Sequence, residues 1–386
     1  MDETTICVID MKGKFVLETK VETDSDAIVT ALGRLRRVGH EAGSLSPWLQ
    51  VELQQRGLPA VCLEGYHARA ALSAMRNETD RTDAQGVAHI LRTGWFKQVH
   101  VKSEGSYRLR LLLTHRRNLK RKFLDIENAI RHSIRTFGLK LGAVSRGQFE
   151  ARVRELTARD ALIAGIAHCM LRARAALWEE YLRLHKLVVN AVSRNDVCRR
   201  FLGIPGIGPI SALAFKTSID DPQRFGHSKT VGAYLGLTAR RWQSGTSIDV
   251  SGRISNAGDG EVRHPLYEAA NIMLTRFKGF SSLKARGLKI AKKRGHKRAC
   301  VAVARKLSVI MHAMWRNGST FQFKAPAARE KQQTKRAPKL LAGPVGIQVE
   351  APTRRSEGIR VSGATVLMQT KGSTISCLWR VLATPR

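Results

Sequence analysis

Short strand-like segments alternate with helical ones through the first hundred residues, and this alternation restricts the fold more than any other feature of the chain. The strand-like segments lie at residues 4–10, 14–21, 37–40, 59–64 and 99–102, with helical segments at 47–56 and 80–92 between them. A hairpin followed by strand–helix–strand alternation is typical of an α/β sheet. We therefore predict an α/β domain over residues 1–103.

The rest of the chain is predicted to be mostly helical, so that the fold class is α/β plus α. Residues 104–200 are basic and helical, and their imperfect heptads favour a helical hairpin or dimerisation arm over a long coiled coil. The sequence FLGIPGIGPI at 201–210 ends this region and opens a second globular domain that extends to 323. Residues 324–386 are polar, basic and without a periodic apolar face, so we predict a disordered tail.

The charge of the chain points to a polyanionic partner. There are 66 Lys and Arg residues against 31 Asp and Glu, which gives a formal charge of +35. A compact fold with this charge repels itself unless a polyanion neutralises it, and nucleic acid is the usual one. A ribosomal or chromatin-like packing protein is the alternative, although such proteins tend to be shorter and to lack clustered acids.

The cysteines and the apolar segments indicate a cytoplasmic protein. None of the six cysteines forms a CxxC pair, so we expect reduced, mostly buried thiols rather than a zinc finger. No apolar run approaches the roughly 20 residues of a membrane span, and the N-terminus lacks the pattern of a secretory signal. We therefore expect no membrane partner.

Two sets of residues could carry chemistry. Asp80 and Asp83 lie three apart on a predicted helix, and Glu41 follows a strand-like segment. Carboxylates gathered from a strand end and a helix can bind Mg²⁺, which prefers hard oxygen ligands. Ser244 precedes a glycine in a polar loop beside Arg240 and Arg241, where its hydroxyl could attack a phosphodiester. From the residues alone, a solvated helix face and an ordinary loop serine explain these patterns equally well or better.

Two further segments could contact phosphates. The turn from Pro205 to Gly208, with glycines at 206 and 208, resembles a helix-hairpin-helix turn, whose backbone N–H groups can hold a DNA phosphate, although a plain glycine turn fits equally well. Residues 284–306 form a basic helical run that we interpret as a phosphate-contacting surface rather than a device for solubility. Its densest cations are Lys292, Lys293, Arg294, Lys297 and Arg298.

Taken together, several motifs resemble the insertion-sequence 110 family of transposases, and more closely its 1111 subgroup. The motifs are HEAGSLSPWL, ETDRTDAQGVAHILRTGW, VCRRFLGIPGIGPISALAF, GAYLGLTARRWQSG and GRISNAGDG, and their order fits that family over about residues 3–323. The resemblance implies a RuvC-like, RNase H-fold N-terminal domain with an Asp-Glu-Asp-Asp site for Mg²⁺. It also implies a helical middle and a C-terminal domain with a serine that joins transiently to DNA.

Residue by residue, the resemblance assigns metal binding to Glu41, Asp80 and Asp83 and catalysis to Ser244. Some members of the family use a structured RNA that pairs with donor and target DNA, so a guide RNA joins DNA and a second copy of the chain as a candidate partner. The first Asp of the family has no counterpart here, because the chain begins after that point. We therefore expect the central first strand of the sheet to be missing. A second departure is Asn256, where relatives usually carry a basic residue.

The leading functional hypothesis is therefore DNA transposition and site-specific recombination by Mg²⁺-dependent serine chemistry. One competing hypothesis is an inactive relic that binds nucleic acid without cutting it. Another is a RuvC-like nuclease that uses water as its nucleophile. A covalent protein–DNA product distinguishes the first hypothesis from the other two.

Overall fold

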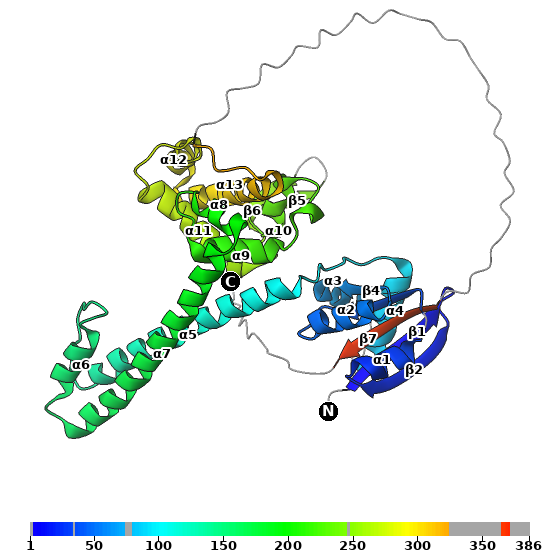
Figure 1. Ribbon diagram of the computed structural model, residues 1–386, viewed down its shortest axis with the longest axis horizontal. Coiled ribbons are helices and arrows are strands. Elements are labelled where there is room, and N and C mark those ends of the chain that lie inside the picture. The colour runs from blue at the N-terminus through cyan, green and yellow to red at the C-terminus, as the bar shows by residue number, and fades with distance from the viewer. Residues whose placement is uncertain (1–2, 34, 74–78, 245–247, 324–363, 371–386) are drawn as a thin grey trace, which may run out of the picture. The chain divides into compact units, whose positions relative to one another are not determined.

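The computed structural model describes residues 3–33, 35–73, 79–244, 248–323 and 364–370, which form two compact units (Figure 1). Unit 1 comprises Met1–Val101 with Thr334–Arg386, and unit 2 comprises Lys102–Gln333. The predicted boundary near 200 does not separate two compact units. Leu113, Val188 and Val192 of the long helices join the same buried core as the helices beyond 200.

Unit 1 is built on a five-stranded mixed sheet with the order β2-β1-β7-β3-β4. Its strands are β1 (Glu3–Asp10), β2 (Phe15–Glu22), β3 (Arg37–Glu41), β4 (Ala60–Leu63) and β7 (Ala364–Thr370). β1 and β2 are antiparallel, and β3 and β4 are parallel. The strand expected at 99–102 is not formed, and an isolated bridge between Leu63 and Gln98 stands in its place.

Strand β7 corrects two of the predictions from the sequence. It lies between β1, to which it is antiparallel from Thr4↔Thr370 to Asp10↔Ala364, and β3, to which it is parallel from Arg37↔Thr365 to His40↔Met368. The central position that we expected to be empty is therefore occupied, and residues 364–370 are not part of a disordered tail. The other residues beyond 323 lie outside the described part of the chain.

Helices cover both faces of this sheet. They are α1 (Ser25–Leu32), α2 (Ser46–Gln55), α3 (Gly65–Leu72) and α4 (Asp80–Thr93). Ile6 and Val8 of β1 belong to the apolar cluster that contains residues of α1 and α2, whereas Cys7 and Ile9 belong to the cluster that contains residues of α4. Successive side chains of a strand point to opposite faces, so β1 is buried on both. This explains its nearly continuous apolar sequence.

Unit 2 begins with a helical arm. The arm contains α5 (Glu104–Arg135), α6 (Phe149–Thr157) and α7 (Ala161–Ser193). Arg116 contacts Tyr181, and Glu127 accepts hydrogen bonds from Arg174 at 2.7 and 2.9 Å, so α5 and α7 run antiparallel. The two long helices thus form a helical hairpin, the arrangement that the sequence favoured over a long coiled coil.

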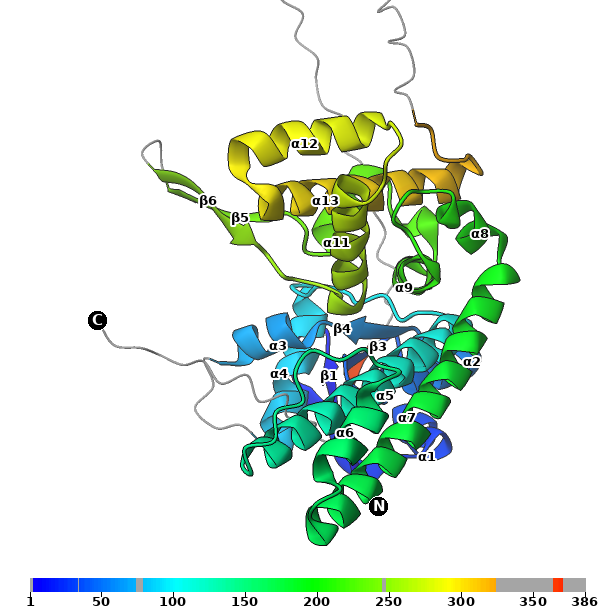
Figure 2. The same cartoon turned by 90° about the vertical axis from the view of Figure 1, so that its left-hand side faces the viewer.

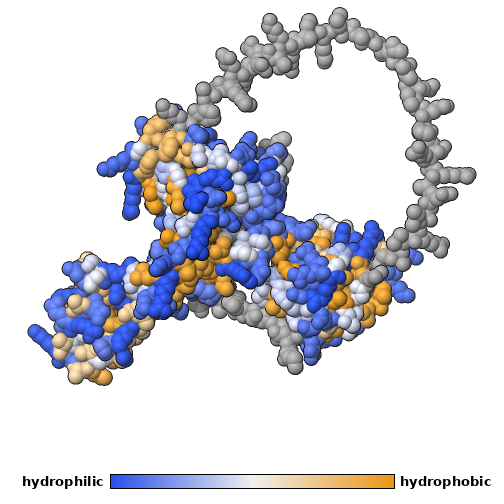
Figure 3. Space-filling view, viewed as in Figure 1, coloured by the Kyte–Doolittle hydropathy of each residue, from blue (hydrophilic) through white to orange (hydrophobic). Residues whose placement is uncertain are grey.

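Helix α7 is long and apolar enough to cross a membrane by length and composition alone. Arg174, in the middle of that helix, is 7% exposed and is paired with Glu127 of α5. Apolar and hydrophilic side chains are interspersed over the surface of the arm (Figure 3). These features are those of a helix that packs against other helices of its own chain.

The remainder of unit 2 is a helical domain with a two-stranded ribbon. Its helices are α8 (Asp196–Leu202), α9 (Pro209–Ile219), the 3₁₀ turns η1 (Pro222–Arg224) and η2 (Ser228–Thr230), α10 (Val231–Tyr234), α11 (Gly260–Thr275), α12 (Ser282–Arg294) and α13 (His296–Asn317). The ribbon consists of the antiparallel strands β5 (Ala239–Ser244) and β6 (Ile248–Ile254). It projects from the helices of unit 2 (Figure 2).

Candidate functional site

The half-buried carboxylate of Glu41 lies at the carboxyl end of β3, against the first residue of α3. A Cβ atom on Gly65 would lie 2.4 Å from Glu41 Oε1, so only glycine allows the carboxylate to occupy this place. Burial raises the pKa of Glu41, and the nearby charge of Asp83 raises it further, whereas Arg69 opposes both effects. The structure thus brings Glu41 and Asp83 into electrostatic contact.

Asp80 and Asp83 occupy the first turn of α4. The helix begins where predicted because Thr79 caps it: the Thr79 hydroxyl accepts from Thr82 N, and the Thr82 hydroxyl accepts from Thr79 N. Carboxylates are favoured in a first turn by the helix dipole. Within the described residues, no three His, Cys, Asp or Glu side chains lie close enough together to hold a metal ion. Asp80 is therefore not assembled with the other two acids into one cluster.

The pair formed by Glu41 and Asp83 nevertheless fits Mg²⁺ in its chemistry. Mg²⁺ commonly binds through one or two carboxylates and keeps several waters or takes phosphate oxygens. Burial is the main cause of the raised pKa of Glu41, and the smaller contribution from the charge of Asp83 is what a divalent cation would relieve.

Asp10 also ends a strand, and its carboxylate is engaged in the turn that follows. Its Oδ1 accepts the backbone N–H groups of Lys12 and Lys14, both at 2.8 Å, in the turn between β1 and β2. These bonds lower the pKa of Asp10 and commit one carboxylate oxygen to the turn.

Ser244 is the last residue of β5 and is exposed at the end of the ribbon, where it pairs with Ile248. Among the described residues, no side chain or backbone group is hydrogen-bonded to its hydroxyl. Arg240, on the same strand, donates to Ser255 O at 3.1 Å and so braces the base of the ribbon. The arrangement leaves the serine hydroxyl exposed on a strand that also carries Arg240 and Arg241.

The loop that follows the ribbon is held by ion pairs that the sequence did not reveal. Asp259 pairs with Arg110 of α5 at 2.5 Å, and Glu261 pairs with Arg117 of the same helix. Arg263 donates to Leu235 O at 3.1 Å and so ties the loop to the segment before β5. The acids of the GDGE sequence therefore position the ribbon on the arm.

Asn256 adopts a left-handed backbone conformation with φ of 53°. Asn tolerates this region better than most residues do. The structure therefore gives a conformational reason for Asn at this position.

The same ion pairs occupy much of the positive charge of α5. Arg108 pairs with Glu104, and Arg116 donates to Tyr181 Oη at 2.5 Å and to His185 Nδ1 at 3.2 Å. Together with Arg110 and Arg117, these side chains have partners within the chain. Among residues 108–122, the cations that remain exposed and without an ion pair in the described structure are Lys120, Arg121 and Lys122.

The turn from Pro205 to Gly208 is determined in part by packing. Gly206 has φ of +89°, and a Cβ atom there would lie 2.3 Å from Ala269 O of α11, so glycine is required at this position whether or not a ligand binds. Gly208 caps the N-terminus of α9, where Pro209 is the first residue, and a Cβ atom on Gly208 would meet nothing within 4 Å. Phosphate binding at this helix end stays a prediction.

The five predicted cations of the basic run lie on both sides of Gly295. Lys292, Lys293 and Arg294 form the last turn of α12, where the helix dipole favours cations. Lys297 and Arg298 lie in the first turn of α13, where the dipole disfavours them. All five are exposed, and none has an ion pair within the described residues. An external anion is the natural partner for cations placed against a helix dipole.

Comparisons with known proteins show the family of the chain. A model described as the transposase IS116/IS110/IS902 family matches residues 198–286, and a transposase model of the DEDD type for the IS110 group matches residues 1–137. The chain is 27% identical over 330 residues to the transposase for insertion sequence element IS1111A of Coxiella burnetii, which covers 83% of this chain and 89% of that protein.

Two further relatives extend the comparison. A putative transposase of Sinorhizobium fredii is 24% identical over 253 residues, or 64% of this chain and 65% of the relative. The pilin gene-inverting protein of Moraxella bovis is 32% identical over 119 residues, or 31% of this chain and 36% of that protein. With both family models matched in order, these relationships support an enzyme that acts on DNA. The chain belongs to the IS110 family of transposases.

Proposed function

We propose that the chain cuts and rejoins DNA strands through a covalent intermediate on Ser244. The observation that carries this proposal is the exposed Ser244 hydroxyl at the end of β5, inside the segment that matches the family model. A hydroxyl that reacts with DNA must be reachable by a phosphodiester, and cations beside it can hold the phosphate oxygens.

The proposed step forms a bond between Ser244 Oγ and phosphorus while the bond from phosphorus to one strand oxygen breaks. The serine proton leaves to solvent or to a neighbouring base, and the released strand oxygen takes up a proton. The positive charge of Arg240 and Arg241 on the same strand attracts the DNA backbone to the ribbon. The reverse step, by a new strand hydroxyl, restores the serine and joins the strands.

Glu41 and Asp83 are proposed to hold the divalent metal ion, Mg²⁺, that the DEDD-type match suggests in general terms. Asp80, which stands apart from them in the described structure, is proposed to join them when the metal binds. The bound ion would polarise a phosphodiester and stabilise charge on its oxygens. Within the chain, Gly65 leaves room for the Glu41 carboxylate, and the capped first turn of α4 presents the two aspartates. The mixed sheet with helices on both faces supports a RuvC-like, RNase H-type fold for this unit.

A Ser244→Ala variant tests the nucleophile. Incubation of the full chain with end-labelled insertion-end DNA and Mg²⁺, followed by denaturing electrophoresis, should show a protein–DNA adduct for the parent chain and none for Ser244→Ala. DNA binding should be nearly unchanged, because the hydroxyl contributes little contact area. The matched control is Ser255→Ala, which removes a hydroxyl at the base of the same ribbon and should leave the adduct intact. An adduct in the Ser244→Ala variant would refute the assignment.

Binding without cleavage is the second candidate function. The observation that favours it is that the described residues contain no cluster of three potential metal ligands. It predicts tight DNA binding by both the parent chain and Glu41→Gln, with no strand breaks from either. A nuclease that uses water would instead give metal-dependent breaks that survive Ser244→Ala and disappear in Glu41→Gln.

The proposed partners are DNA, a guide RNA and a second copy of the chain. For self-association, the end of the helical arm is the favoured surface, because Phe137, Leu162 and Ile166 are 62%, 74% and 56% exposed. They line an apolar hollow of about 120 Å³ between α5 and α7. A monomeric mass in light scattering at micromolar concentration would contradict self-association.

The guide RNA would be supported if one discrete RNA copurifies with the chain. Ribonuclease treatment should then remove both this RNA and recombination.

A further inference from the structure

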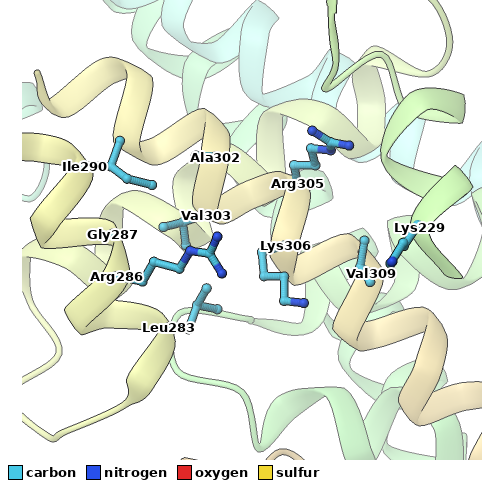
Figure 4. A pocket seen from close by; sticks show the side chains of 10 residues that line it. All are labelled: Lys229, Leu283, Arg286, Gly287, Ile290, Ala302, Val303, Arg305, Lys306 and Val309. Atoms are coloured by element: carbon cyan, nitrogen blue, oxygen red, sulfur yellow. The ribbon is translucent and has the colours of Figure 1, made fainter. Parts of the chain in front are cut away.

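Two hollows lie side by side along helices α12 and α13 of unit 2. The first, of about 330 Å³, is lined by Lys229 from η2 together with residues of both helices (Figure 4). The second, of about 460 Å³, lies between α12, α13 and the segment after α13. Both are lined by Leu283, Arg286 and Lys306, so the two cations stand at the boundary between the hollows.

The charge of this groove is positive and uncompensated. Arg286 comes from α12 and Lys306 from α13, and Lys229 and Arg305 extend the positive charge along the first hollow (Figure 4). In the described part of the chain these four side chains form no ion pair, and no Asp or Glu lines either hollow. Unpaired cations that converge on a concave surface favour an anionic ligand.

The floor of each hollow is apolar, so it suits a ligand with an apolar face better than a small ion. Leu283, Ile290 and Val303 line the first hollow, and Ile310, Met314 and Phe321 line the second. The second hollow also has hydrogen-bonding groups, from Ser282, Ser319, Thr320 and Gln322. A free phosphate would need only the cations, whereas a nucleotide presents a charged phosphate and a flat base with apolar faces.

From this alternation of hollow, cation pair and hollow, we infer that the groove binds a single-stranded segment of DNA. Arg286 and Lys306 hold one phosphate, and the nucleotides on either side place their bases in the two hollows. A polynucleotide has the same alternation of base and phosphate along its length. Duplex DNA does not fit this pattern, because its bases are stacked and paired inside the helix and cannot enter separate hollows. The inference concerns strand binding alone and does not depend on the chemistry proposed for Ser244.

The test uses the full chain and a fluorescent oligothymidylate of about 12 nucleotides, with binding followed by anisotropy across a series of salt concentrations. Replacing both cations, Arg286→Gln with Lys306→Gln, should lower the slope of log affinity against log salt by about 0.7, the value for one phosphate that is no longer neutralised on a single strand. Binding at 0.1 M salt should weaken by about 5-fold on the same basis. The matched control, Lys140→Gln with Arg159→Gln, removes two exposed cations from the arm and should leave both values unchanged.

A second variant keeps the charge and fills the first hollow. Ala302 lines that hollow, and Ala302→Phe should weaken binding of the oligonucleotide while leaving the slope in place. Thermal unfolding of each variant shows that the fold is retained. Equal losses in the control variant, or an effect of the charge change without any effect of Ala302→Phe, would show a general basic surface and overturn the inference. Preferential binding of an RNA of the same length, or of inorganic phosphate alone, would overturn the assignment to DNA.

Discussion

Strand β7 gives the sharpest test of how unit 1 is held together. Without it, the sheet would divide into two two-stranded pieces, the hairpin β1–β2 and the parallel pair β3–β4. Two-stranded pieces are at best marginally stable in water. Deleting residues 364–386 should therefore abolish the cooperative unfolding transition of unit 1, a loss of about 5–15 kcal/mol for a domain of ordinary stability. This is the reverse of what a disordered tail predicts.

A single substitution provides a graded version of the same test. In the strand register, Val366 is paired with Val8 of β1 on one side and with Val38 of β3 on the other. Its backbone N–H group therefore lies within the central hydrogen-bond ladders of the sheet. Val366→Pro removes that donor and leaves an acceptor unpaired, at a cost of about 1–3 kcal/mol. For a unit of about 100 residues this lowers Tm by roughly 4–24 °C. Val366→Ile keeps the N–H group and serves as the control.

The assay is differential scanning calorimetry of the full chain, with limited proteolysis to assign each transition to a unit. Loss of unit 1 should leave the transition of unit 2 in place, because the structure assigns Lys102–Gln333 a separate core. A synthetic peptide with the sequence of residues 362–372 should restore protection of unit 1 in the deletion variant, and a scrambled peptide should not. Unchanged Tm values for both the deletion and Val366→Pro would refute the assignment of a structural role to β7.

Two further predictions follow from the charges. Because the folded state raises the pKa of Glu41 above its ordinary value of 4.5, the stability linked to this group is present below about pH 4.5 and is lost as pH rises through the higher folded value. Glu41→Gln should therefore raise the Tm of unit 1 at pH 7 but not at pH 4, and an equal gain at both would contradict the burial argument. DNA binding should weaken steeply with salt, by up to about 10³-fold between 50 and 200 mM if roughly six phosphates are neutralised. A flat titration would refute the basic-surface interpretation.

The helices and strands of unit 1 could be predicted closely because their signals are local. The segments expected at 4–10, 14–21, 47–56 and 80–92 became Glu3–Asp10, Phe15–Glu22, Ser46–Gln55 and Asp80–Thr93. Alternation of apolar residues, a proline in the first turn and a threonine cap are all encoded within a few residues. β7 could not be found in this way, because its partners β1 and β3 lie more than 300 residues earlier in the chain.

For the candidate sites too, the sequence predicted the residues but not their contacts with residues far away in the chain. Glu41, Asp80 and Asp83 were identified through the motifs that carry them, but the sequence could not show that Asp83 lies near Glu41 while Asp80 completes no cluster in the described residues. The partners of Arg110 and Arg117 follow some 150 residues later, so a count of cations on α5 overestimates its free charge.

Motif residues of unit 2 therefore divide into those that hold the structure and those left available to a ligand. Asp259 and Glu261 are occupied by arginines of α5, and Gly206 is required by the carbonyl of Ala269. Substituting any of these should disturb DNA processing through the position of the ribbon or of α9, without any contact to DNA. Ser244, by contrast, is exposed and has no hydrogen-bond partner within the described residues. Packing therefore does not account for a serine at this position. Its exposure at the end of the ribbon is compatible with the nucleophilic role proposed for it.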